Sequence, residues 1–344
     1  MKIKAAIFSI ATILISLVLS LVILEYVVRW TIPAYDPSGR IGFMDGAEAS
    51  KIVGYPVPVL GRPNTVQRQI KNTGDFDVEV SFNKYGFRDD RDVADIRPDD
   101  YVVVGDSVSF GWGVEEKDRV SERLEPMIGQ RVFNISLPVG ILDTEKLIAY
   151  AASRGAQIKR LIFILSTENR LIEVAGPSHP SQAVLPTKLP AQFLQAKKFL
   201  MEKSAMYFLV TSLIHRNPML KDMAVRVGLI FPSQEAIIDK PYDAVAVTAT
   251  ADYLARMSQR YEMLLVVVPS RGIWFGHTQA EALKTHQELI RALIDRPIDV
   301  LDLKKLYDSY PEPLSLYFPN DGHWRPEIHG AAAGEISRHI KSKQ

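Results

Sequence analysis

Two short segments, far apart in the chain, hold residue types that together could perform nucleophilic catalysis. Ser107 closes a turn after the uncharged run at 101–104, and His323 lies two positions after Asp321. A serine hydroxyl is a weak nucleophile at neutral pH, so it needs a base within hydrogen-bond reach and a third group that fixes the base's tautomer. In a locally extended segment, Asp321 and His323 leave the same face. The pattern therefore predicts Ser107 as nucleophile, His323 as base and Asp321 as the group that orients the base.

The same residues also have structural interpretations, which the spacing leaves open. A serine at the end of a strand can cap the helix that follows, and Gly105-Asp106-Ser107 consists of ordinary turn residues. Asp321 could cap the helix that is predicted to begin at 325–327, which would leave His323 on the surface.

The elements that must position these residues follow the pattern of an α/β protein. Uncharged runs without alternation predict strands buried on both faces, as in a parallel sheet, at 101–104, 161–165, 263–268 and 300–301. Helical patterns fall between and beside them, at 117–128, 143–155, 246–260 and 278–295. Ligand sites in open α/β sheets lie at the carboxyl ends of the strands, which is where Ser107 is expected.

The segments around these residues resemble a known family. The run 103–111 and the later segment 321–324, Asp-Gly-His-Trp, are similar to the SGNH (GDSL) hydrolases. The paired Asp-x-His-Trp resembles the branch related to bacterial surface-polysaccharide acetylation enzymes, and 83–88 is similar to the lead-in of membrane-anchored bacterial members. The resemblance covers roughly residues 75–344. It implies a flavodoxin-like three-layer α/β/α sandwich and an esterase or acyltransferase without a metal or organic cofactor.

The resemblance also implies an oxyanion hole, made by the backbone amides of Ser107 and a glycine together with an asparagine side chain. Asn169, just after the predicted strand 161–165, matches the asparagine. Gly140 matches the glycine but lies one place later than the commonest spacing. The donor is therefore open between the amides of Val139 and Gly140.

The chain departs from the family pattern at two further positions. Arg170 stands where an aspartate usually follows the asparagine. Asn320 stands three positions before His323, where the conventional Asp-x-x-His has its aspartate. Either Asp321 orients His323, or the triad reduces to a dyad.

The N-terminal segment is predicted to anchor the chain in a membrane. Lys2 and Lys4 precede the uncharged run 5–24. Its twenty residues make about 30 Å of helix, which is enough to cross the hydrocarbon core. A cleaved signal peptide is the alternative, although the run is longer than usual and no small-x-small cleavage site precedes Glu25. The two lysines are expected to keep the N-terminus in the cytoplasm, which places the rest of the chain outside it, in the periplasm or at the cell surface.

Composition limits the remaining function classes. The 344 residues are 47% hydrophobic, carry a formal net charge of +1 and include no cysteine. Nucleic-acid binding is disfavoured, and a disulfide scaffold, thiolate zinc sites and a cysteine nucleophile are excluded. We expect an anchor at 1–30, a stalk and entry segment at 31–95, and an SGNH-like domain at 96–344. An insertion at about 171–245 includes an apolar helical stretch at 199–214.

Together these features predict a membrane-anchored serine esterase or O-acyltransferase. Its expected substrate is an acyl ester, most simply an acetyl ester, of a cell-envelope carbohydrate. The alternative is a catalytically inactive SGNH-fold scaffold or a polysaccharide-binding protein of envelope assembly. Envelope-assembly proteins are candidate partners, and no cofactor is expected.

Overall fold

The computed structural model describes residues 2–168, 171–172, 191–227 and 241–344, which form two compact units. The first, called here the N-terminal unit, combines Met1–Ile41, Arg68–Asp77 and Pro186–Pro232 as far as they are described. The second, called the sheet unit, contains the described parts of Gly42–Gln67, Val78–Leu185 and Ser233–Gln344. The predicted nucleophile, base and orienting carboxylate all belong to the sheet unit.

Five parallel strands form the centre of the sheet unit. They are β5 (Tyr101–Gly105), β6 (Val132–Asn134), β7 (Arg160–Ser166), β8 (Glu262–Val268) and β9 (Asp299–Asp302). Their order across the sheet is β6-β5-β7-β8-β9, and every neighbouring pair is parallel. Numbered along the chain, this is the 2-1-3-4-5 order of flavodoxin-like doubly wound sheets.

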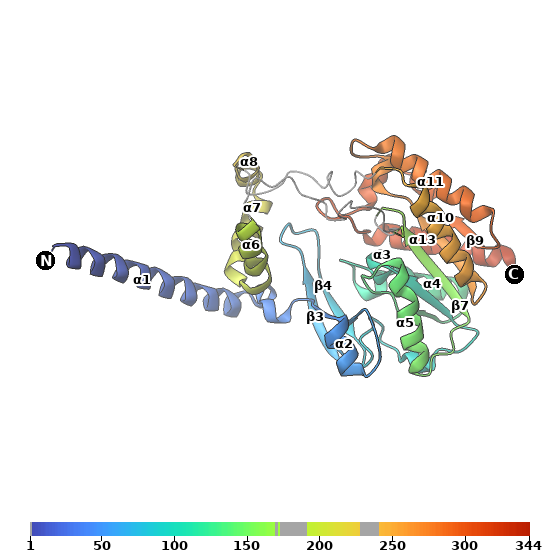
Figure 1. The fold of residues 1–344 in the computed structure, drawn as a ribbon, viewed down its shortest axis with the longest axis horizontal. Helices are drawn as coiled ribbons and strands as arrows, with labels where there is room; N and C mark the ends of the chain where they lie inside the picture. The colour runs from blue at the N-terminus through green and yellow to red at the C-terminus, as the bar shows by residue number, and fades with distance from the viewer. Residues whose placement is uncertain (1, 169–170, 173–190, 228–240) are drawn as a thin grey trace. The chain divides into compact units, whose positions relative to one another are not determined.

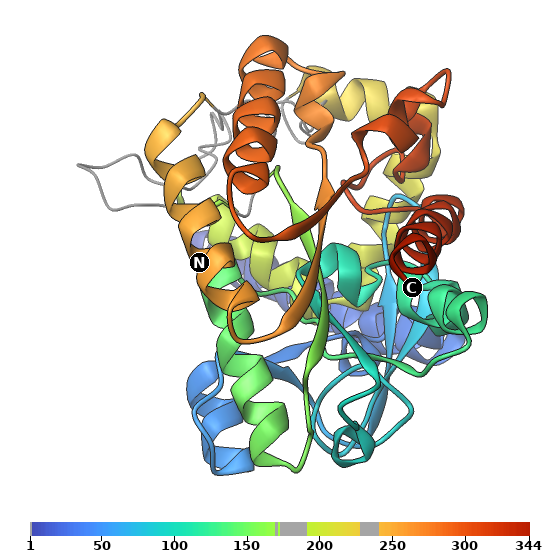
Figure 2. The same cartoon turned by 90° about the vertical axis from the view of Figure 1, so that its right-hand side faces the viewer.

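Helices cover both faces of this sheet. Figure 2 shows α4 and α13 on one side, and α5 and α10 on the other (Figures 1 and 2). The bounds of the larger helices are α4 (Val120–Ile128), α5 (Ile141–Ser153), α10 (Ala244–Ser258), α11 (Gln279–Ile294) and α13 (Pro326–Lys343). The arrangement confirms the predicted three-layer α/β/α fold.

The core between the sheet and α13 follows from the spacing of apolar residues on that helix. Ile328, Ala332, Ile336 and Ile340 recur every four positions and are all buried. They belong to one cluster with strand residues such as Val103. The apolar face of α13 therefore packs against the sheet beneath β5, the strand that leads to Ser107.

Shorter elements complete the sheet unit, and two of the strands among them extend into residues 68–77, which belong to the N-terminal unit. They are β1 (Phe43–Asp45), α2 (Gly46–Val53), β2 (Val59–Gly61), β3 (Thr65–Ile70), β4 (Asp77–Phe82), α3 (Ser107–Phe110) and α12 (Lys304–Asp308). The strands β1 and β2 pair antiparallel, and β3 pairs with β4. One-turn 3-10 helices occur at Val93–Asp95, Glu116–Asp118, Arg271–Ile273 and Pro313–Leu316.

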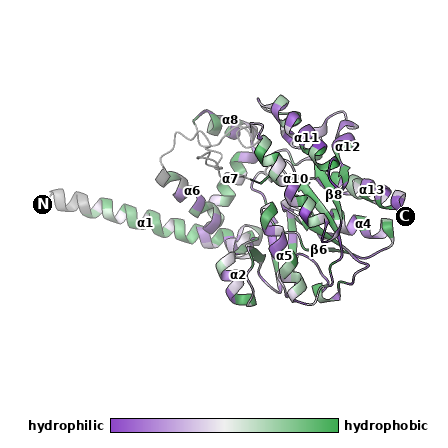
Figure 3. Cartoon of the chain, turned by 45° about the vertical axis from the view of Figure 1, so that its right-hand side comes forward, coloured by the Kyte–Doolittle hydropathy of each residue, from purple (hydrophilic) through white to green (hydrophobic). Residues whose placement is uncertain are grey.

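The described residues of the N-terminal unit contain one long helix and three shorter ones. These are α1 (Lys2–Thr31), α6 (Ala191–Lys203), α7 (Ala205–Arg216) and α8 (Pro218–Arg226), with 3-10 turns at Pro33–Tyr35 and Pro37–Gly39. Figure 3 shows that most of α1 is hydrophobic. Among the described residues, Phe8–Thr31 is the one helical stretch long and apolar enough to cross a membrane.

The stretch 199–214, which is predicted to be helical, is helical in the structure but belongs to two helices, α6 and α7. The stretch is divided at Ser204, which ends α6 and caps α7. The side-chain oxygen of Ser204 accepts a hydrogen bond from the backbone N–H of Tyr207 at 3.0 Å. A serine side chain that bonds a nearby amide favours a helix start over a helix interior, which explains the break.

A buried histidine in the sheet unit predicts a specific dependence of stability on pH. His329 on α13 is fully buried, and neither ring nitrogen has a hydrogen-bond partner among the described residues. Burial, together with the positive charges of Arg88 and Arg119, lowers the pKa of His329 to about 3. The unfolded chain, with an ordinary histidine pKa near 6.5, therefore binds more protons than the folded chain between these two values.

We expect the free energy of unfolding to fall as the pH drops from 7 towards 4. The full loss of stability from this histidine, reached below pH 3, is roughly 5 kcal/mol as an upper value. In His329→Leu this contribution is absent, so the curve of stability against pH should be flatter. Thermal denaturation at a series of pH values measures both curves, and parallel curves for the two proteins would contradict the prediction.

Candidate active site

Ser107 is the first residue of α3, directly after the turn that follows β5, and its side chain does not cap the helix. Asp106 is the N-cap of α3, and its carboxylate accepts from the N–H of Val108 at 2.8 Å. Gly105 has a φ of +154°, and a Cβ there would lie 2.5 Å from the carbonyl oxygen of Ile164. Only glycine fits this close approach between strands. The turn thus directs Ser107 to the carboxyl edge of the sheet.

His323 and Asp321 lie in a tight loop just before α13. The loop is closed by backbone bonds from Asp321 N–H to the carbonyl of Phe318 at 3.1 Å and from Phe318 N–H to that of His323 at 3.1 Å. His323 N–H also donates to the Asp321 carboxylate at 3.2 Å. The structure assigns the N-cap of α13 to Arg325, with no side-chain capping bond. Asp321 therefore does not cap the helix.

The structure brings the three predicted residues into one chain of hydrogen bonds. His323 Nε2 lies 2.9 Å from Ser107 Oγ, and His323 Nδ1 contacts the carboxylate of Asp321. Asp321 is buried, with 6% of its surface exposed. Because a carboxylate accepts at Nδ1, that nitrogen carries the proton and Nε2 is left as the acceptor for the serine O–H. This is the arrangement that a serine nucleophile and its base require.

Trp112 holds the imidazole from its face, a contact that the sequence analysis did not identify. Its ring stacks on that of His323, with centroids 5.3 Å apart and planes inclined by 25°. Trp112 in turn stacks on Phe43 at 6.4 Å. The one feature of the sequence that could have indicated this contact is the position of Trp112, five residues after Ser107. Trp324, in contrast, is fully buried and belongs to the core cluster between the sheet and α13.

The sequence analysis also did not predict a buried ion pair, Arg271–Glu168, next to the catalytic loop. Arg271, just after β8, donates from Nε to Glu168, just after β7, at 2.9 Å, and its Nη2 lies 2.5 Å from the same carboxylate. Burial lowers the pKa of Arg271, but the hydrogen bonds and charge of Glu168, with the charge of Asp321, raise it above its usual value. The arginine therefore stays charged beside the catalytic loop. Residues 168 and 271 are 103 positions apart, so no local spacing joins them.

The loop packs directly against this arginine at Gly322. A Cβ at Gly322 would lie 2.7 Å from Cζ of Arg271, and the guanidinium is held in place by Glu168. The guanidinium thus fills the space that any larger residue between Asp321 and His323 would occupy. Glycine at this position lets the arginine set the position of the loop.

We expect Gly322→Ala to displace the loop and lower kcat/KM for a small ester roughly 10- to 100-fold, since small misplacements of catalytic groups are costly. Gly334→Ala on α13 is the control, because a Cβ there meets nothing within 4 Å. That change should leave activity near the wild-type value and slightly raise the melting temperature. Equal activity of the two variants would show that Arg271 does not set the loop.

The structure narrows the choice of oxyanion donors. The Val139 N–H donates to the carbonyl of Leu137 at 2.7 Å, so it is already engaged. The N–H groups of Ser107 and Gly140 have no acceptor within the described part of the chain. Gly140 is the N-cap of α5, where unpaired amides and the helix dipole favour negative charge.

The segment around Gly140 also lies close to the serine turn. A small cavity is lined by Gly105 and Asp106 on one side and by Val139 and Ile141 on the other. The third predicted donor, Asn169, lies outside the described residues, as does Arg170.

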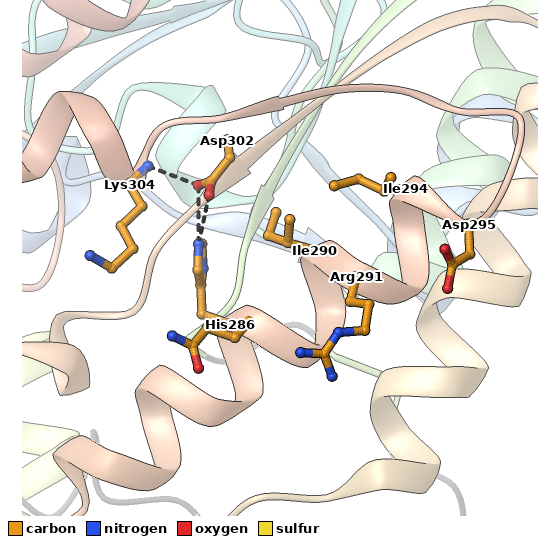
Figure 4. Close-up of a pocket in the computed structure, with 8 residues that line it drawn as sticks. His286, Ile290, Arg291, Ile294, Asp295, Asp302 and Lys304 are labelled. Carbon is orange, nitrogen blue, oxygen red and sulfur yellow. Dashed lines mark hydrogen bonds and ion pairs between the residues drawn. The ribbon is translucent and has the colours of Figure 1, made fainter.

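A larger cavity elsewhere in the sheet unit lacks a nucleophile. It has a volume of about 360 Å³ and lies between α11 and the end of β9 (Figure 4). His286 Nε2 lies 3.0 Å from the Asp302 carboxylate, which also accepts from the N–H of Lys304 at 2.8 Å. No hydroxyl or thiol side chain is among the residues that line it. Within the described residues, no group of three or more His, Cys, Asp or Glu side chains could hold a metal ion.

Fold and site together define a doubly wound α/β protein with a Ser–His–Asp cluster at the carboxyl edge of its sheet. No protein-family model matches the chain, and no curated protein sequence matches it either. Solved structures do resemble it in fold, and two of them are described as a G-D-S-L family protein and an SGNH hydrolase. One, from Desulfitobacterium hafniense, is described as a lipolytic protein of the G-D-S-L family; it is 13% identical, with 70% of this chain and 99% of that chain covered and a TM-score of 0.38.

Two further matches have more specific descriptions. A carbohydrate esterase family 2 enzyme with a carbohydrate-binding domain, from Corynascus thermopiles, is 10% identical, with 72% and 67% of the two chains covered and a TM-score of 0.40. The catalytic domain of peptidoglycan O-acetyltransferase A from Streptococcus pneumoniae is 12% identical, with 71% and 91% covered and a TM-score of 0.31. At these identities the similarity concerns the fold alone, so the chemistry must be argued from the residues.

Proposed function

We propose that this protein is an SGNH-type serine esterase or O-acyltransferase. The observation that carries the proposal is the contact of 2.9 Å between Ser107 Oγ and His323 Nε2, with Asp321 on the other ring nitrogen. The partly exposed imidazole and the buried carboxylate give the base access to substrate and a fixed orientation.

In the proposed mechanism, Ser107 Oγ attacks the carbonyl carbon of an ester while His323 Nε2 takes the hydroxyl proton. The N–H groups of Ser107 and Gly140 stabilise the oxyanion of the tetrahedral intermediate. His323 then gives its proton to the departing alcohol, which leaves an acyl group on Ser107. Water or the hydroxyl of an acceptor then attacks this acyl group while passing its proton to His323. His323 returns that proton to Ser107 Oγ as the bond between the serine and the acyl group breaks, which restores the free enzyme. Asn169 is the proposed third oxyanion donor.

The substrate and the location are proposed from the sequence. Asp-Gly-His-Trp at 321–324 resembles the branch of polysaccharide acetylation enzymes, which supports an acetyl ester of an envelope carbohydrate. The apolar helix Phe8–Thr31, with Lys2 and Lys4 before it, supports a membrane anchor with the sheet unit outside the cytoplasm.

One labelling experiment tests the activated serine and its location together. A membrane-impermeant fluorophosphonate added to intact protoplasts or spheroplasts should label the full chain, and Ser107→Ala should abolish the label. Labelling only after lysis would place the site inside the cell. If no label appears in either case, the proposal of an active hydrolase fails and the inactive scaffold remains. Mass spectrometry of an added oligosaccharide acceptor then distinguishes acyl transfer from hydrolysis.

A further inference from the structure

Within the N-terminal unit, the end of α1 holds the start of α7. The Glu25 carboxylate accepts from the backbone N–H groups of Ala205 at 2.8 Å and Met206 at 3.0 Å, and from the hydroxyl of Ser204 at 2.7 Å. These are amides of the first turn of α7, which lack partners within their own helix. A carboxylate at a helix N-terminus is also favoured by the helix dipole.

A second set of contacts fixes the same junction. Arg29 donates from Nε to Glu25 at 2.8 Å and from Nη2 to the carbonyl of Lys203 at 2.9 Å. Val28 is buried with Tyr35 and Phe208 in one small cluster. The last two turns of α1 and the first two turns of α7 therefore form one packed junction.

The position of this junction along α1 sets its depth relative to a membrane. The uncharged run 5–24 is about as long as the hydrocarbon core is thick, so Glu25 is the first charged residue beyond it. Tyr26 and Trp30, in the next turns, are 67% and 84% exposed. Aromatic residues in such positions are typical of the membrane–water interface. If α1 spans the membrane, the N-terminus of α7, which is bonded to Glu25, lies at the membrane–water interface.

The three helices that are tied to this junction expose many apolar side chains. The exposed ones are Phe193, Phe199 and Leu200 on α6, Val210 and Leu213 on α7, and Met219, Met223 and Val227 on or next to α8. Residues 191–227 contain six Lys or Arg residues against two Asp or Glu residues, an excess of four positive charges. Apolar side chains with surplus cations are the composition of helices that lie on anionic lipid surfaces.

We propose that α6, α7 and α8 form a lipid-binding surface that lies on the bilayer beside α1. Their apolar side chains enter the boundary between headgroups and acyl chains, and their cations face anionic lipid phosphates. The inference rests on the proposed membrane anchor and is independent of the proposed catalysis. Because α7 begins at the interface, a bilayer is the nearest apolar phase that these side chains can reach.

The chain's lack of cysteine makes a site-specific test direct. Full-length protein carrying Met223→Cys and a bimane label is reconstituted into vesicles of phosphatidylethanolamine and phosphatidylglycerol. Part of the lipid carries a nitroxide near the headgroup end of its acyl chain. We expect roughly twofold quenching of the Met223 label, as for a residue in the acyl boundary. Labels at Met219 and Leu213, each in its own variant, repeat the measurement where one substitution perturbs its helix.

Two control labels separate this inference from the anchor itself. Ile294→Cys labels an apolar residue of α11 that is at least as exposed as Met223, at 67% against 58%, but belongs to the sheet unit, and it should not be quenched. Val18→Cys labels the middle of α1 and should be quenched by nitroxides deeper in the chain. Quenching at Val18 with none at Met223, Met219 or Leu213 overturns the lipid-binding surface and leaves the anchor. No quenching at Val18 overturns both.

Discussion

Replacing Ser107 with alanine should abolish ester turnover, with a loss in kcat on the order of a thousandfold or more. The reason is that the attacking atom is removed, while His323 and Asp321 keep their own contact. Stability should change by less than about 1 kcal/mol, because the Ser107 side chain caps no helix and makes one side-chain hydrogen bond, to His323. Initial rates with a small acetyl ester and thermal denaturation of the same samples measure the two effects.

A neighbouring serine provides the matched control. Ser109 lies on the same short helix and is fully buried, and its Oγ donates to the carbonyl of Asp106 at 3.0 Å. Ser109→Ala removes this buried hydrogen bond, so it should cost about 1 kcal/mol of stability while keeping most of the activity. Turnover at the wild-type rate in Ser107→Ala would end the assignment of the nucleophile.

The sheet was predictable because its strands carry a strong local signal. β5, β7 and β8 are apolar between their end residues, since helices cover both faces, and each lies within one residue of its predicted range. The short strand β6, with three residues, has too little apolar sequence to stand out by itself. The turn at Ser107 follows from its position directly after β5.

Contacts between distant segments were not predictable in the same way. Ser107 and His323 are 216 positions apart, and they were paired in the sequence by the chemistry of their residue types and by the family resemblance, whereas the structure places their atoms 2.9 Å apart. Arg271 and Glu168 belong to no motif that would pair them. In the sequence, each of the two would be taken for an ordinary charged residue at the surface. Glu25 likewise reads as a flanking charge of the anchor, although it caps a helix about 180 residues later. These pairings depend on tertiary packing, which no local pattern encodes.

The orienting role of Asp321 separates a triad from a dyad. Asp321→Asn keeps the size of the side chain, but its amide can donate to Nδ1 of His323 and so favour the tautomer with the proton on Nε2. That nitrogen could then no longer accept the proton of Ser107. We expect a loss in kcat of two to four orders of magnitude, with little change in KM. A loss below about tenfold would indicate that Ser107 and His323 act as a dyad.

Replacing His323 with alanine should be as damaging as replacing Ser107, about a thousandfold or more in kcat. Without the imidazole nitrogen of His323 as acceptor at 2.9 Å, the hydroxyl of Ser107 keeps its proton and is a poor nucleophile. If the two residues act as one unit, the double variant Ser107→Ala/His323→Ala should lose no more than either single variant, because each change already removes the covalent step. The measurement is kcat/KM for the wild type, both single variants and the double variant in one buffer. Losses that multiply would mean that His323 contributes independently of Ser107, and a different group would then have to activate the serine.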